Sequence, residues 1–358
     1  AAALTLVNAA GGSGTFSTIT DNQDGTYTAL FTGTTAGTNA IKGSLNGGGL
    51  TSVAPSVLVT PGAPSLLKSV VTLSSATVVA GNSVTATLQL ADAAGNKLTT
   101  GGQTVAFLLG SPNGGQGTFG TVTDNLNGTY TTKFTGSTAG ANTITATIGG
   151  QTLTSGAPSI SVAVGSVSLA SSTIAIASAK ITSGTTTTVT LQARDSVGNK
   201  LATGGLTVTF GLGGNSGALG TFGAVTDNKN GTYTAVFTGT IAGTNTISAK
   251  IGGQPVTSAG PSFTVTPGAV SLAKSAVTLS SGSVTSGSTI TALMQAYDAA
   301  GNKLTTGGST VVFSLGANAG ASGTFGAVKD NLDGTYTSVF TGVLAGTNTI
   351  KPHWVARH

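Results

Sequence analysis

The sequence predicts an all-β protein built from tandem β-sandwich domains. Three observations lead to this prediction: a repeat of constant length, dense alternation of apolar and polar residues, and the absence of helical periodicity. Thr, Val and Ile dominate the alternating runs, because branched side chains suit the pleated surface of a sheet. With 39% hydrophobic residues, the chain has enough apolar side chains to fill ordinary domain cores.

The repeat is marked by the segment Asp-Asn-x-(Asp/Asn)-Gly-Thr-Tyr-Thr, which begins at Asp21, Asp124, Asp227 and Asp330, a step of 103 residues. The same step separates the Gly-Thr-Phe triplets and the segments Asp-x-x-Gly-Asn-Lys-Leu. This period exceeds that of solenoid repeats and propeller blades and matches one immunoglobulin-type sandwich. We therefore expect tandem immunoglobulin-like β-sandwich domains in a linear array.

Domain boundaries are expected near Gly62, Gly165 and Gly268, where Pro and Gly cluster between two strand-like runs. Linkers of only a few residues favour a semi-rigid row of domains over a flexible string. The predicted domains are residues 1–62 (repeat 1), 63–165 (repeat 2), 166–268 (repeat 3) and 269–358 (repeat 4).

Within repeat 2, five strands can be predicted from residue alternation and the flanking Gly-rich turns. The segment from Ser83 to Leu90 alternates apolar and polar residues, as a strand with one buried face should. The other four strands are predicted at residues 104–109, 129–135, 143–148 and 160–164.

The Asp-Asn-x-(Asp/Asn)-Gly-Thr-Tyr-Thr segment predicts a turn followed by a strand. A calcium loop of the EF-hand type is excluded, since its ligand spacing differs, the fourth position is Asn127 in repeat 2, and the chain contains no Glu. Asp and Asn can bond their own backbone in such a turn, and Gly can adopt the positive φ. The expected turn glycines are Gly25, Gly128, Gly231 and Gly334.

The Tyr of this segment and the Phe four residues later point to the same strand face, so both are expected in the core. Such a Tyr resembles a tyrosine corner, in which the ring packs inward and the hydroxyl bonds upstream backbone. The predicted core residues are Tyr27, Tyr130, Tyr233, Tyr336, Phe31, Phe134, Phe237 and Phe340.

The segments that open at Asp92, Asp195 and Asp298 read as turns between strands, with each Asp as the local hydrogen-bond acceptor. A metal-binding role for these three residues is the alternative. It would require several backbone carbonyls to converge on the Asp at a junction between domains.

Composition argues against catalysis and against nucleic-acid binding. Charged residues make up only 6% of the chain, against about 25% in a typical soluble domain. The chain has no Cys and no Glu, and its two histidines, His353 and His358, lie at the extreme C-terminal end, outside the recurring positions, so we expect no catalytic triad. The net charge of +5 reflects the scarcity of acidic residues, and the Lys and Arg are scattered singly instead of forming the basic cluster that nucleic-acid binding needs. We expect no enzyme activity, no cofactor, no nucleic-acid partner and no membrane insertion in this segment.

A combination of stretches in repeat 2 resembles bacterial immunoglobulin-like domains of the invasin and intimin group (Big-1 type). The stretches are Val-Thr-Ala-Thr-Leu-Gln-Leu-Ala-Asp-Ala-Ala-Gly-Asn-Lys-Leu from Val84, Val-Ala-Phe from Val105, Gly-Thr-Phe from Gly117 with the Thr-Asp turn after it, and Ala-Gly-Ala-Asn-Thr-Ile from Ala139. The turn segment is also similar to filamin-type repeats. This resemblance implies a structural or adhesive protein at the cell surface, with the repeats forming a stalk or scaffold. Partners would be other copies of the chain or neighbouring surface proteins and glycans.

Two further functions are kept as alternatives. One is a subunit of an extracellular filament, sheath or surface layer that is completed by strand or edge pairing between chains. The other is a carbohydrate-binding module, for which Tyr297 and Trp354 are the candidate aromatic residues.

The two ends of the sequence are unusual. Repeat 1 lacks equivalents of residues 63 to about 103, and Lys351 to His358 are expected to replace the closing strands of repeat 4. Either the sequence is part of a longer repetitive protein, or a neighbouring chain supplies the strands. In the second case Trp354 would be a possible interface residue.

Overall fold

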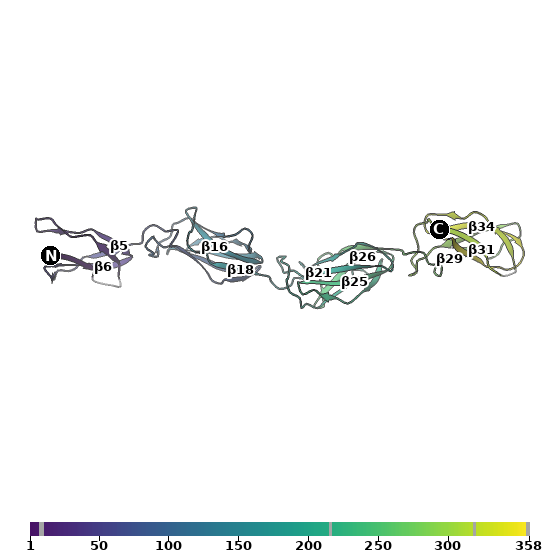
Figure 1. The fold of residues 1–358 in the computed structure, drawn as a ribbon, viewed down its shortest axis with the longest axis horizontal. Coiled ribbons are helices and arrows are strands. Elements are labelled where there is room, and N and C mark those ends of the chain that lie inside the picture. Colours follow the sequence, from purple (N-terminus) through teal and green to yellow (C-terminus); the bar gives the residue numbers. More distant parts are fainter. Residues whose placement is uncertain (7–10, 215–216, 318–319, 356–358) are drawn as a thin grey trace. The chain divides into compact units, whose positions relative to one another are not determined.

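The computed structural model describes residues 1–6, 11–214, 217–317 and 320–355. Every regular element in these residues is a β-strand, which confirms the predicted all-β class (Figure 1). No described helix is long and apolar enough to cross a membrane. The chain divides into two compact units, Ala1–Gly165 and Ser166–His358, which are described separately.

Repeat 2, in the first unit, forms two sheets that enclose one core. Pairing is antiparallel except between β10 and β18, which run parallel. One sheet has the order β10 (Thr77–Val79), β18 (Ser159–Ala163), β16 (Gly140–Ile148) and β12 (Val105–Leu109), with β17 (Gln151–Thr152) on β16. The other has the order β13 (Gln116–Phe119), β15 (Thr129–Thr138), β11 (Ser83–Gln89) and β9 (Val70–Leu73), with β14 (Thr123–Asp124) on β15.

Repeat 3, in the second unit, has the same strand order around its own core. Its first sheet runs β20 (Lys180–Thr182), β28 (Ser262–Thr266), β26 (Gly243–Ile251) and β22 (Val208–Leu212), with β27 (Gln254–Pro255) on β26. Its second sheet runs β19 (Thr173–Ile176), β21 (Thr186–Gln192), β25 (Thr232–Ile241) and β23 (Leu219–Phe222), with β24 (Thr226–Asp227) on β25.

The core of repeat 2 follows from the alternation of its strands. Alternate residues of β11 and β15 are buried, and Tyr130 and Phe134 are almost fully enclosed. The Tyr130 hydroxyl accepts a hydrogen bond from the backbone N–H of Gln103 at 2.8 Å. This bond ties the start of β15 to the segment before β12. Tyr233 and Tyr336 accept equivalent bonds from Leu206 and Ser309.

Repeat 1 contains only part of this arrangement. It forms β1 (Ala2–Leu6), β2 (Ser13–Phe16), β3 (Thr20–Asp21), β4 (Tyr27–Thr28), β5 (Phe31–Thr35), β6 (Gly37–Leu45), β7 (Gly48–Gly49) and β8 (Ser56–Val59). The expectation that Tyr27 is a core residue is wrong, because its side chain is 46% exposed. Phe31 is only half-buried. The described part of residues 1–62 contains no counterparts of β9, β10 and β11, and β11 is the strand that pairs with the Tyr130 segment in repeat 2.

Repeat 4 differs from repeats 2 and 3 along one side. Its strands are β29 (Ala276–Leu279), β30 (Thr289–Gln295), β31 (Thr310–Leu315), β32 (Ser322–Phe325), β33 (Lys329–Asp330), β34 (Thr335–Leu344) and β35 (Ile350–Val355). We expected Lys351 and the following residues to replace the closing strands. In the structure, β35 pairs with β31 in the register in which β16 pairs with β12, with Val311 opposite Trp354.

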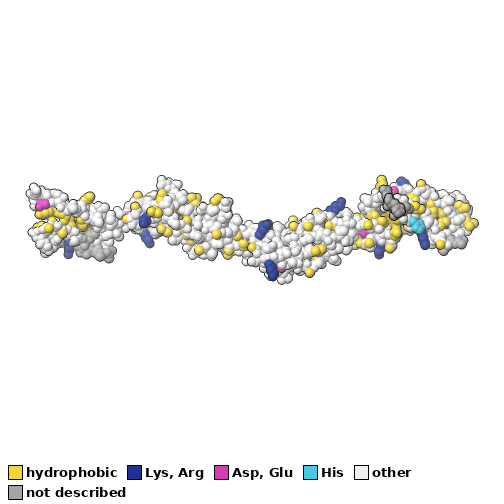
Figure 2. Space-filling model, in the orientation of Figure 1, with side chains coloured by type: hydrophobic (Ala, Val, Ile, Leu, Met, Phe, Trp, Pro, Cys, Tyr) yellow, Lys and Arg dark blue, Asp and Glu magenta, His cyan; other side chains and the backbone are white. Residues whose placement is uncertain are grey.

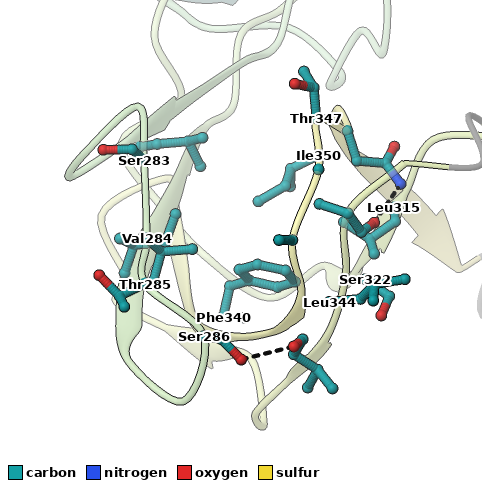
Figure 3. A pocket seen from close by; sticks show the side chains of 18 of the residues that line it. Ser283, Val284, Thr285, Ser286, Leu315, Ser322, Phe340, Leu344, Thr347 and Ile350 are labelled. Carbon is teal, nitrogen blue, oxygen red and sulfur yellow. Dashed lines mark hydrogen bonds between the residues drawn. The ribbon is translucent and has the colours of Figure 1, made fainter.

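The Trp354 ring packs against its own domain, with its centroid 5.7 Å from that of the Tyr336 ring in an edge-to-face arrangement. No described strand of repeat 4 takes the place that β18 and β28 occupy in repeats 2 and 3. A cavity of about 630 Å³ lies there, and Figure 3 shows Val284, Phe340 and Ile350 around it.

Candidate functional site at the junction between repeats

The junction between repeats 1 and 2 is built on the turn that follows β11. The backbone N–H of Asp92 donates to the carbonyl of Asn96, and the N–H of Gly95 donates to the carbonyl of Asp92. Asp92 Oδ1 also accepts the N–H groups of Ala94 at 3.0 Å and Asn96 at 2.9 Å. Asp therefore closes the turn with its own side chain, as Asp does in tight turns generally.

The second carboxylate oxygen of Asp92 bonds the linker and the Asn side chain. Oδ2 accepts the N–H of Gly62 at 2.9 Å and the Asn96 side-chain amide at 2.8 Å. Asp92 is only 6% exposed. One carboxylate therefore connects the linker between repeats to the turn of repeat 2.

Asn96 reaches across the junction to repeat 1. Its Nδ2 donates to the carbonyl of Thr34 at 2.9 Å, and its Oδ1 accepts the N–H of Ala36 at 2.8 Å. Thr34 lies near the end of β5, and Ala36 connects β5 to β6. We call the pair formed by Asp92 and Asn96 the junction clamp, because Asp92 fixes the Asn side chain that holds the neighbouring repeat.

The second unit contains an equivalent junction clamp between repeats 3 and 4. Asp298 Oδ2 accepts the N–H of Gly268 and the Asn302 side-chain amide, both at 2.8 Å. Asn302 Nδ2 donates to the carbonyl of Thr240, and its Oδ1 accepts the N–H of Ala242, again both at 2.8 Å. Asp298 and Asn302 are 1% and 7% exposed. The arrangement therefore recurs with the same atoms in the same roles.

Asp195, the third predicted turn residue, has the same local bonds. Its Oδ1 accepts the N–H groups of Val197 and Asn199, and its Oδ2 accepts the Asn199 side-chain amide at 2.9 Å. The side chain is fully buried.

The atoms that converge on these carboxylates are donors, not carbonyl oxygens. A cation site would need several oxygen ligands around the ion, whereas Asp92 and Asp298 each accept four N–H groups. Among the described residues, no group of three or more His, Cys, Asp or Glu could hold a metal. Carboxylates surrounded by N–H donors fit a hydrogen-bonded junction between repeats.

Hydrogen bonding keeps these carboxylates ionised. The bond from the Gly62 N–H, together with the bonds from Asn96, lowers the pKa of Asp92 to about 2. Burial acts to raise the pKa of Asp298, but the bonds from Gly268, Asn302 and Ala300 lower it more, so its pKa also lies below the ordinary value.

We expect the first junction to be insensitive to pH down to mild acid and to loosen only near pH 2. A carboxylate with a lowered folded-state pKa contributes stability above its unfolded pKa of about 3.9, and that stability is lost as pH falls through the folded value. The amide resonance of Gly62, followed by NMR against pH, should shift with a midpoint of about 2. A midpoint near 4 would contradict the hydrogen bond from Gly62.

The junction role of Asn96 was not predicted from the sequence. The sequence did contain one signal for it, an Asn four residues after the Asp in repeats 2, 3 and 4. A role in the turn was enough to explain that Asn, so no contact with another repeat was inferred.

The two aromatic candidates for carbohydrate binding, Tyr297 and Trp354, are each half-buried. Lys and Arg side chains are scattered along the visible face and do not gather into one basic patch (Figure 2).

The family model described as invasin, domain 3, matches residues 65–165, 168–268 and 271–355 of this chain, and this match confirms the resemblance inferred from the sequence. Similar solved structures include FdeC, an Escherichia coli adhesin, with 27% identity over 84% of this chain and 96% of that chain (TM-score 0.45). Invasin, a bacterial integrin-binding protein, shares 22% identity over 80% of this chain and 57% of its own (TM-score 0.40). InvD of Yersinia pseudotuberculosis shares 24% identity over 79% and 82% (TM-score 0.38). No curated protein matches the sequence.

Proposed function

Because the chain belongs to the invasin domain 3 family, we propose that its repeats act as a non-catalytic spacer in a bacterial cell-surface adhesin. The observation that carries this proposal is the junction clamp, which recurs between repeats 1 and 2 and between repeats 3 and 4. A spacer transmits position only if its joints resist bending. Two hydrogen bonds from one buried or half-buried Asn to the backbone of the preceding repeat restrict such bending.

The inventory of side chains supports a mechanical role over a chemical one. The most strongly hydrogen-bonded acidic groups hold turns and linkers, and the buried tyrosine hydroxyls bond backbone N–H groups. Of the two aromatic candidates for carbohydrate binding, Trp354 packs its ring on Tyr336 within its own domain. The spacer is therefore preferred to a carbohydrate-binding module.

Replacing Asn302 with Ala should broaden the distribution of distances between repeats 3 and 4 without unfolding either repeat. The variant loses the bonds to Thr240 and Ala242 but leaves both cores intact. Since the chain has no Cys, spin labels can be placed uniquely at K250C and K329C, two exposed sites in repeats 3 and 4. Pulsed electron resonance on the full chain then measures the distribution.

The matched control is Asn331→Ala, which removes an Asn side chain that donates to the Thr335 hydroxyl within its own turn. It should leave the distribution unchanged. If the distance distribution of Asn302→Ala is as narrow as that of the parent chain, the proposed spacer mechanism is wrong. Antibodies against the chain should also label intact producing cells, and labelling that requires permeabilisation would contradict a surface location.

A further inference from the structure

The backbone of β12 has an unpaired edge. Thr104 accepts the N–H of Gly149, and the N–H of Gly110 donates to Thr143, so the even-numbered positions bond β16. In an antiparallel pair, the residues between them direct their N–H and C=O groups away from that neighbour. Val105, Phe107 and Leu109 therefore present backbone donors and acceptors on the other side, where no described strand pairs with them.

The other three sheet edges of repeat 2 carry features that limit pairing with another chain. The edge strand β13 has a bulge between Gln116 and Gly117, and bulges disrupt a ladder locally. The edge strands β10 and β9 have only three and four residues. By contrast, β12 is five residues long, regular in register, and free of Pro, Gly and charge. Such an edge is the kind at which chains associate.

The side chains on the outer face of β12 are apolar. Ala106 is exposed, and Leu108 is 42% exposed. The equivalent outward positions are Thr209 and Gly211 in repeat 3, and Val312 and Ser314 in repeat 4. Repeat 2 therefore has the most apolar version of this edge.

We propose that β12 is a self-association edge, at which a second copy of the chain adds its own β12 in antiparallel orientation. With Phe107 opposite Phe107 of the second copy, Val105 lies opposite Leu109, and all six free backbone pairs are satisfied across a two-fold axis. Ala106 then lies opposite Leu108 of the second copy, and the small and large side chains pack together. The two sheets become one continuous sheet.

A second copy fits this edge better than an unrelated strand, for two reasons. The register that satisfies the backbone of one copy satisfies the other by symmetry, so no further surface is required. Neither strand carries a charge, so the net charge of +5 places no like charges opposite each other at the contact. The proposal goes beyond the spacer function and does not depend on it, because it concerns contacts between chains and not the junctions within one.

Mixed cysteine variants test the register directly. Ala106 and the opposing Leu108 occupy a non-hydrogen-bonded pair, where Cα atoms lie about 4.5 Å apart, within the range of a disulfide. Mixing full-length Ala106→Cys chains with Leu108→Cys chains under mild oxidation should give a covalent dimer. Either variant alone should give much less, since like positions are diagonal neighbours about 7–8 Å apart. No dimer in the mixture, or equal yields in all three samples, would overturn the proposed pairing.

Charge at the edge provides the second test. Leu108→Lys should weaken self-association at least about tenfold in sedimentation equilibrium, because it puts an unpaired charge into the contact. Leu126→Lys, an equally large change at a 75% exposed loop position of the same repeat, should leave association unchanged. A parent chain that stays monomeric up to its solubility limit would refute the proposal, as would an equal loss in both variants.

Discussion

Replacing Phe134 with Ala should lower the free energy of unfolding of repeat 2 by about 3–5 kcal/mol, the range for a large aromatic residue deleted from a packed core. Phe134 is 0% exposed, and its ring centroid lies 5.1 Å from that of Phe119. A Cβ at Gly117 would fall 2.5–2.6 Å from ring atoms of Phe134, so the backbone of β13 lies directly on this ring. Packing on this ring therefore explains the Gly and the Phe of the Gly-Thr-Phe triplet in repeat 2.

Urea denaturation would measure this loss. Unfolding should be followed by far-ultraviolet circular dichroism and not by tryptophan fluorescence, because the single Trp lies in repeat 4. The equivalent Phe31 in repeat 1 is only half-buried, so Phe31→Ala should cost clearly less. Equal losses at the two positions, or a loss at Phe134 of no more than about 0.5 kcal/mol, as expected of a surface substitution, would contradict the packing described for this ring.

Sequence reasoning predicted the fold class because strand alternation and a repeat of constant length can both be read from the sequence without any knowledge of tertiary contacts. It also predicted that Gly128 adopts a positive φ, and the observed value is +79°. It did not predict the equally left-handed φ of +59° at Leu126 in the same turn. The residue at this position varies between repeats, and the conformation is imposed by Asp124, whose Oδ1 accepts the Leu126 N–H at 2.8 Å.

The junction clamp lay beyond sequence reasoning for a different reason. Asn96 and Ala36 are 60 residues apart, and the turn chemistry of Asp92 already gave a sufficient reason for an Asn at this place. The same limit applied to Trp354. Its segment lacks the Thr-rich pattern of the corresponding strands, yet pairing with β31 keeps the register. Contacts across large sequence separations override local composition in both cases.

Replacing Gly128 with Ala should destabilise repeat 2 by more than the cost of backbone strain alone. A non-glycine residue at this φ costs about 1–2 kcal/mol. The new Cβ would also overlap the backbone oxygen of Leu98. Movement to relieve the overlap is restricted, because the carbonyl of Gly128 accepts the N–H of Leu90 at 2.9 Å and Leu98 in turn bonds Leu90 at 3.0 Å.

Gly95→Ala provides the control that separates these two effects. Gly95 has a φ of +91°, but nothing lies within 4 Å of where its Cβ would be. Its replacement should therefore cost only the strain of about 1–2 kcal/mol, whereas Gly128→Ala should cost that strain plus the repacking around Leu98. Urea denaturation of the full chain compares the two. Similar losses of unfolding free energy in the two variants would mean that the turn can move away from Leu98 without cost. In that case the glycine of the Asp-Asn-x-(Asp/Asn)-Gly segment would be required for its backbone conformation alone and not for its close packing.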